Sequence, residues 1–194
     1  MTPAIAKAIW ILGGIAWFVI RYPHQRRSWR TPVRSSARNW RERLLLAVSL
    51  SGLGVVPCLY LATGFPRGAD YKFSPELAWV GTLVFAAALW LFYRTHADLG
   101  RNWSVSLEVR DRHTLITAGI YRRIRHPLYA AFWLWAIAQA LLLPNWVAGT
   151  AGLVGFGTLF FFRVGREEQL MIETFGEEYR AYMRQTSRIV PFVY

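Results

Sequence analysis

The sequence predicts an all-α integral membrane protein with about five transmembrane helices, the last two of which form a helical hairpin beside a cytoplasmic cofactor pocket. Three observations lead to this prediction. The chain is 54% hydrophobic and only 18% charged, whereas soluble domains carry about 25% charged residues. Its apolar residues form long blocks rather than amphipathic stripes. Its basic residues gather in the polar segments between those blocks.

Five apolar blocks account for the predicted spans. A helix that crosses the hydrocarbon core needs about 20 apolar residues, and the blocks cover residues 3–20, 44–62, 77–93, 128–143 and 146–162. Only Pro144 and Asn145 separate the last two blocks, which predicts a hairpin with a tight turn. We expect one domain over residues 1–194. Residues 1–93 supply three N-terminal spans, and residues 94–194 supply the cofactor-binding loop, the hairpin and the C-terminal tail.

The distribution of arginine predicts the topology. Residues 21–43 hold eight Arg and a single acid, Glu42, and an excess of basic residues marks cytoplasmic segments. Two further crossings return residues 94–125, which hold seven Arg, to the same side. The N-terminus is then expected outside and the C-terminus in the cytoplasm. This describes a multi-pass protein of the cell membrane in a prokaryote, or of the endoplasmic reticulum in a eukaryote.

Composition and motifs also argue against several function classes. The net charge of +12 resides in short loops between apolar blocks, which indicates contact with anionic membrane lipids rather than nucleic acid. The four His lack the close spacing of a metal site, so no metal is expected. A P-loop, a GxGxxG fingerprint and a nucleophile motif are all missing from the sequence, which excludes a soluble Rossmann-type methyltransferase.

Two polar stretches are the candidate functional site. The first, residues 115–129, ends a polar loop and opens an apolar block; the second, where the hairpin's second arm ends, contains Arg163, Arg166, Glu167 and Glu168. The simplest interpretation is a proline-initiated helix and an interfacial salt bridge. The functional interpretation uses the four-residue spacing of Arg163 and Glu167, which sets both on one helix face. Glu167 would then bind a ligand's ammonium group, and Arg163 would bind a carboxylate.

The same stretches carry a family resemblance. The run His113-x-Leu115-x-Thr117-x-Gly119-x-Tyr121, followed by Arg125-His126-Pro127-x-Tyr129, resembles the signature of the isoprenylcysteine carboxyl methyltransferase family. Arg163, Glu167-Glu168 and the later Phe175-Gly176-x-x-Tyr179-x-x-Tyr182 resemble its C-terminal pattern. The resemblance covers about residues 94–194, and the chain looks like a short, prokaryotic-type member. The Arg-His-Pro-x-Tyr step also occurs in phospholipid methyltransferases and, more loosely, in membrane sterol reductases.

The resemblance implies an enzyme that uses S-adenosyl-L-methionine to methylate the C-terminal carboxylate of a prenylated cysteine, and that releases S-adenosyl-L-homocysteine. It implies that Arg163 is the catalytic, substrate-binding residue. The residues that it assigns to the cofactor are His113, Thr114, Leu115, Ile116, Tyr121, His126, Pro127, Leu128, Tyr129 and Glu167. Its partners are a lipidated cysteine or another lipid substrate, and membrane lipids.

Two other activities and one non-catalytic role stay open at this point. Methyl transfer to the amine of phosphatidylethanolamine would need a deprotonated amine, whereas a carboxylate with a pKa of about 3.5 is already ionised at neutral pH. A membrane sterol-type reductase would bind NADPH, and a scaffold would bind no nucleoside.

Overall fold

The computed structural model describes residues 1–28, 33–36, 40–99, 108–110 and 114–193. Helices dominate the described chain, and two short strands form a small antiparallel ribbon. The helices are α1 (Pro3–Ser28), α2 (Trp40–Leu50), α3 (Val56–Thr63), α4 (Pro75–Leu99), α5 (Pro127–Leu142), α6 (Trp146–Phe175) and α7 (Glu177–Gln185). A π-helical turn, η1 (Ser51–Val55), joins α2 to α3. Two 3-10 turns, η2 (Arg67–Ala69) and η4 (Gly119–Arg122), and the strands β1 (Val33–Ser36) and β2 (Glu108–Arg110) complete the list.

Every predicted span lies within a helical segment of the structure, except that the fourth, residues 128–143, ends one residue beyond α5. Four of these segments are long and apolar enough to cross a membrane: Pro3–Arg26, Trp40–Thr63, Pro75–Leu99 and Trp146–Phe175. The helix α5 has 16 residues, about 24 Å at 1.5 Å per residue, so it is shorter than the other four. Large apolar side chains such as Leu83 and Val154 are 71% and 69% exposed, as is expected of surfaces that face lipid. The chain is therefore an integral membrane protein, and within its described residues four helical segments have full spanning length while α5 is a shorter apolar helix.

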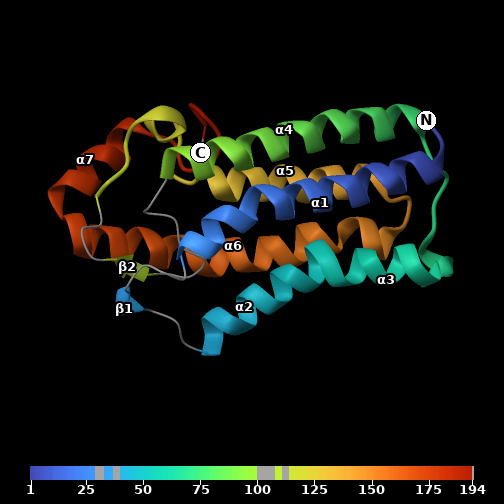
Figure 1. Ribbon diagram of the computed structural model, residues 1–194, viewed down its shortest axis with the longest axis horizontal. Coiled ribbons are helices and arrows are strands. Elements are labelled where there is room, and N and C mark those ends of the chain that lie inside the picture. The colour runs from blue at the N-terminus through green and yellow to red at the C-terminus, as the bar shows by residue number, and fades with distance from the viewer. Residues whose placement is uncertain (29–32, 37–39, 100–107, 111–113, 194) are drawn as a thin grey trace.

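The polar segments lie at two opposite ends of the helix bundle (Figure 1). The N-terminus, the connection from α3 to α4 and the turn from α5 to α6 lie at one end. The strands β1 and β2, the turn η4, the helix α7 and the C-terminus lie at the other. The two termini therefore lie at opposite ends of the bundle, and the side of the membrane that each of them faces stays a prediction.

The hairpin of α5 and α6 is confirmed, and its turn is fixed by Asn145. The Asn145 side chain is fully buried, and its Oδ1 accepts hydrogen bonds from the amides of Val147 and Ala148, which caps the N-terminus of α6. Its Nδ2 donates to the Asp70 carboxylate, 2.7 Å away. The two connections at this end of the bundle are thereby joined.

Small residues let α6 pack closely against η1 as well as against α5. A Cβ added to Gly52 of η1 would lie 2.2 Å from the Ala151 carbonyl oxygen of α6, and one added to Gly149 of α6 would lie 3.4 Å from the Cα of Ala140 in α5. The buried Gln139 of α5 then connects all three segments, since its amide donates to the carbonyls of Gly52 and Ala148 at 3.0 and 2.7 Å.

The second arm of the hairpin is longer than the sequence predicts. The predicted span ends at residue 162, but α6 continues unbroken to Phe175. Gly176 ends it at a φ of 56°, which favours glycine, and α7 follows. The charged residues from 163 to 168 therefore lie on the rigid continuation of a spanning helix.

Which end faces the cytoplasm stays a prediction. In a Cys58→Ser background, a cysteine at Ala69 should react with an impermeant thiol reagent in intact cells, because the positive-inside rule sets that connection outside. A cysteine at Glu178, which is exposed on α7, should react only after the cells are opened. The opposite labelling pattern would invert the topology.

Candidate functional site

A buried ion-pair cluster lies where α2, α5 and α6 meet. Arg163 of α6 points its Nη1 at the Glu42 carboxylate of α2, 3.0 Å away, and its Nε lies 3.6 Å from Glu167 Oε2. The side chains of Glu42 and Arg163 are only 4% and 9% exposed, whereas that of Glu167 is 30% exposed. One guanidinium thus lies between two carboxylates, of which only Glu167 is open to an external ligand.

Tyr129 of α5 orients Glu167. Its hydroxyl donates to Glu167 Oε2 at 2.6 Å, and its ring is packed against Phe160 with centroids 5.5 Å apart. The His126 ring lies 5.4 Å from the Tyr129 ring, and His126 Nδ1 lies 3.9 Å from Glu167 Oε1. The predicted partners His126, Tyr129, Arg163 and Glu167 are therefore brought together.

A third acid, Glu168, is the centre of an adjoining buried network. Its side chain is 6% exposed, and its Oε1 lies 3.1 Å from Arg125 Nε and 3.2 Å from His126 Nε2. Its Oε2 accepts from Arg188 Nη2 at 2.7 Å. Because it pairs with Arg125, His126 and Arg188, Glu168 links three parts of the chain. These are the stretch of residues 115–129, called the motif below, the helix α6 and the C-terminal tail.

The backbone of the tail is hydrogen-bonded to the motif. The amides of Arg125 and His126 donate to the carbonyls of Ser187 and Arg188, both at 2.9 Å. The Arg125 guanidinium also donates to the carbonyls of Met183 and Thr186. These bonds hold the start of α5 against the segment that follows α7.

Tyr182 adds a further bond between α7 and the motif. Its hydroxyl donates to the Tyr121 carbonyl at 2.6 Å. Burial raises the pKa of Tyr182 above its ordinary value, although the nearby Arg125 opposes this shift, so the phenol stays protonated and remains a donor. Burial, together with Tyr182, Glu167 and Asp98 nearby, also raises the pKa of Tyr121.

Asp98, at the end of α4, fixes the backbone at the start of the turn η4. Its Oδ2 accepts a hydrogen bond from the Ile120 amide at 2.9 Å. Gly119 has a φ of 62°, and an added Cβ would lie 2.3 Å from the same oxygen. Both the conformation and the space therefore require glycine at this position.

The other predicted site residues are placed as follows. Residues 114–117 form an irregular segment before η4, in which Thr114 is exposed while Leu115 and Ile116 are half-buried. Pro127 is the first residue of α5 and is buried. Leu128 is half-buried and packs against the apolar cluster of Leu91, Phe92 and Ala131. His113 lies outside the described residues. Arg166 is exposed on α6.

Sequence reasoning missed the roles of Glu42 and Arg188. Residues 21–43 contain eight Arg and one acid, Glu42. An isolated acid in a basic segment is the signal that could have identified it. Arg188 follows α7 in a segment without helical periodicity, and no local pattern connects it to Glu168.

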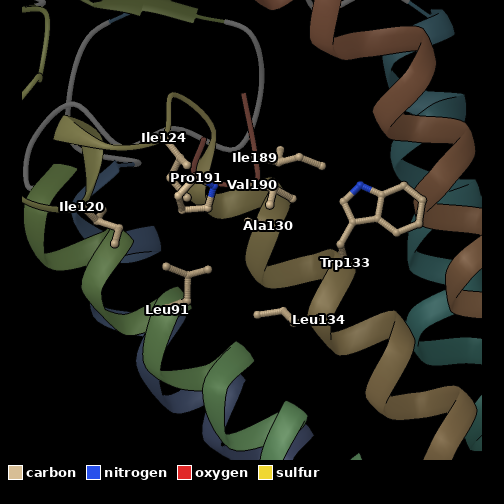
Figure 2. Close-up of a pocket in the computed structure, with 9 residues that line it drawn as sticks. All are labelled: Leu91, Ile120, Ile124, Ala130, Trp133, Leu134, Ile189, Val190 and Pro191. Carbon is tan, nitrogen blue, oxygen red and sulfur yellow. The ribbon is translucent and has the colours of Figure 1, made fainter. Parts of the chain in front are cut away.

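An apolar cavity of about 270 Å³ lies on another side of α5. Figure 2 shows its wall, which α4, η4, α5 and the C-terminal tail build together. The lining residues are all apolar: Leu91, Ile120, Ile124, Ala130, Trp133, Leu134, Ile189, Val190 and Pro191. Trp133 also packs against Phe156 and Phe160, the residues that flank the Tyr129 ring. The cavity and the ion-pair cluster thus share α5 as a wall.

Comparison with known proteins gives consistent results. Residues 79–173 match the profile of the isoprenylcysteine carboxyl methyltransferase (ICMT) family. The chain is 28% identical over 131 residues to a probable protein-S-isoprenylcysteine O-methyltransferase of Oryza sativa subsp. indica, covering 66% of this chain and 67% of the relative. It is 35% identical over 92 residues to protein-S-isoprenylcysteine O-methyltransferase of Homo sapiens, covering 47% of this chain and 32% of the relative.

The fold is also similar to a solved structure. That protein is described as the eukaryotic intramembrane Ras methyltransferase ICMT, without a monobody. The TM-score is 0.54 at 22% sequence identity, and the similarity covers 81% of this chain and 55% of that chain. The present chain therefore spans about two thirds of the rice relative, about a third of the human relative and about half of the solved structure.

Proposed function

Because this chain belongs, through residues 79–173, to the isoprenylcysteine carboxyl methyltransferase family, we propose that it transfers a methyl group from S-adenosylmethionine to the C-terminal carboxylate of a prenylated cysteine. The observation that carries the proposal is the pairing of Arg163 with the partly open Glu167. A buried guanidinium and an accessible carboxylate share one helix face there, 3.6 Å apart. The Arg163 guanidinium can therefore bind an anionic group, and the Glu167 carboxylate can bind a cationic one.

The residues present fit the proposed cofactor. Its methionine end carries an ammonium group, and Glu167 is the acid of the cluster whose side chain is 30% exposed, against 4% for Glu42 and 6% for Glu168. Tyr129 and His126 present ring faces and polar atoms beside it. Glu167, Tyr129 and His126 would hold the cofactor, with residues 113–116, Tyr121, Pro127 and Leu128 as further contacts.

The chemistry then needs orientation more than proton transfer. When bound, S-adenosylmethionine supplies a methyl group on a positively charged sulfur; transfer forms one O–CH₃ bond, breaks one S–CH₃ bond and leaves a neutral thioether. The substrate is already a carboxylate, so no base has to remove a proton. Arg163 would hold that carboxylate by paired hydrogen bonds, and the buried setting of the cluster would keep water away from its oxygen.

The lipid part of the substrate also has a suitable place. The 270 Å³ cavity has a wholly apolar lining and shares α5 with the ion-pair cluster. An isoprenoid chain gains free energy when it leaves water for such a surface. The cavity supports a lipidated substrate in preference to a small polar acid, and we propose that it receives part of the prenyl chain.

The test is methyl transfer by the purified protein. Incubation with labelled S-adenosylmethionine and an S-farnesylcysteine with a free carboxylate should give a base-labile methyl ester. The matched control is the same compound with a C-terminal amide, which should not react because it lacks the nucleophilic oxygen. Transfer to phosphatidylethanolamine instead, at a rate that rises with pH as the amine loses its proton, would replace the proposal with amine methylation. Binding of NADPH without binding of S-adenosylhomocysteine would replace it with a reductase.

A further inference from the structure

Glu42 connects the N-terminal half of the chain to the site. It lies in the first turn of α2, outside the matched range 79–173, yet its carboxylate is 3.0 Å from Arg163 Nη1. Both side chains are at least nine-tenths buried. A buried acid at such a distance from a buried guanidinium is a specific contact, because the loss of hydration has to be offset by a well-formed pair.

We propose that Glu42 is a positioning residue, which fixes the orientation of Arg163 for the substrate carboxylate; the inference rests on the methyl transfer proposed above. It acts through Arg163 and does not itself touch the methyl group. The site then includes α2 as well as the motif and the hairpin.

The physical reason lies in the shape of arginine. A guanidinium is planar and has five N–H donors in a fixed fork, so a carboxylate on one edge sets the direction of the others. Glu42 reaches Arg163 from α2, while Glu167 approaches its Nε from within α6. A side chain that is held from two elements cannot rotate away when the substrate enters. Methyl transfer is sensitive to this, because a shift of about 1 Å in a reacting group can cost about 100-fold in rate.

The charge of Glu42 gives the role a distinctive kinetic signature. Its negative charge weakens the attraction of the cluster for an anionic substrate. Glu42→Gln keeps the shape and one acceptor oxygen but removes that charge, so the attraction should increase while the orientation of Arg163 is lost. We therefore expect kcat to fall at least about tenfold, with a KM for the farnesylcysteine that is unchanged or lower. A residue with a solely structural role would leave both constants of the folded protein unchanged.

The experiment compares Glu42→Gln with Glu173→Gln, a matched control on the exposed side of α6. Both variants and the unsubstituted protein are assayed for methyl ester formation, for S-adenosylhomocysteine binding and for the folded fraction. We expect the control to behave like the unsubstituted protein, and Glu42→Gln to lose kcat while it binds S-adenosylhomocysteine within about twofold of normal. Glu42→Asp keeps the charge but shortens the reach, so it should lower kcat without lowering KM.

A double variant separates action through Arg163 from an independent effect. If Glu42 acts through Arg163, Glu42→Gln should add little to the loss that Arg163→Lys already causes, because residues that act as a unit are not additive. Multiplicative losses would overturn the role.

The remaining outcomes also decide the question. Normal kcat in folded Glu42→Gln, or loss of the folded protein in both the Gln and the Asp variant, would make Glu42 a structural ion-pair partner only. Weakened S-adenosylhomocysteine binding would assign it to the cofactor instead. If the unsubstituted protein does not methylate farnesylcysteine, the proposed function fails and this role fails with it; an active protein with a normal Glu42→Gln overturns the role alone.

Discussion

Arg163→Lys is expected to lower kcat about 100-fold, the cost of a reacting group misplaced by about 1 Å, while the affinity for S-adenosylhomocysteine stays within about twofold of normal. Lysine keeps the positive charge but lacks the planar fork that holds a carboxylate by two bonds. Arg163 is buried against Glu42 at 3.0 Å, so the shorter ammonium group would also change the geometry of that pair. The measurements are steady-state kinetics per folded protein and titration with S-adenosylhomocysteine.

Glu167→Gln is the matched comparison for this prediction. Residue 167 lies on the same helix face as Arg163. Glutamine keeps an oxygen that can accept the hydrogen bond from the Tyr129 hydroxyl, now 2.6 Å long, but it lacks the negative charge that we propose to bind the cofactor's ammonium group. S-Adenosylhomocysteine binding should therefore weaken about tenfold or more, since a hydrogen bond to a charged group contributes about 1.5–3 kcal/mol. Equal loss of cofactor binding in both variants would contradict the separate roles. Normal kinetics in both would reduce the pair to a salt bridge.

Glu168→Gln is expected to have the largest effect on stability. The Glu168 carboxylate faces Arg125, His126 and Arg188 within 3.2 Å and is 6% exposed. Removing one member of a buried ionic group leaves the others uncompensated and costs about 3–5 kcal/mol. For a chain of this size, such a loss lowers Tm by on the order of 10 °C. Thermal unfolding in detergent measures it.

The same variant should also release the C-terminal tail. Arg188 loses its charged partner, and the tail would then depend on the backbone bonds to Ser187 and Arg188 and on the bonds that Arg125 and Tyr182 make between α7 and the start of α5. Limited proteolysis should cut the chain after α7 faster than in the unsubstituted protein. Glu173→Gln, which alters an exposed acid near the C-terminal end of the same helix, serves as the control. A Glu168→Gln protein with normal Tm and normal proteolysis would show that the network adds no net stability.

The sequence by itself determined the class of the protein and the local part of the site. Apolar blocks fix where the spans run, because a helix in lipid has to satisfy its backbone internally and expose apolar side chains. The spacing of Arg163 and Glu167 fixes their common face, because residues four apart in a helix are neighbours. Pro144-Asn145 predicts the hairpin turn for a similarly local reason.

Only the tertiary structure decided which distant groups complete the cluster. Glu42 reaches Arg163 because α2 and η1 pack against α6, where Gly52 of η1 lets the backbones approach closely. Arg188 reaches Glu168 because Gly176 turns the chain after α6 and the tail returns to the motif. A repeating pattern along one helix records which residues share a face, but it does not record which other helix lies against that face. That choice depends on the fit of whole surfaces, which no single segment of this sequence contains.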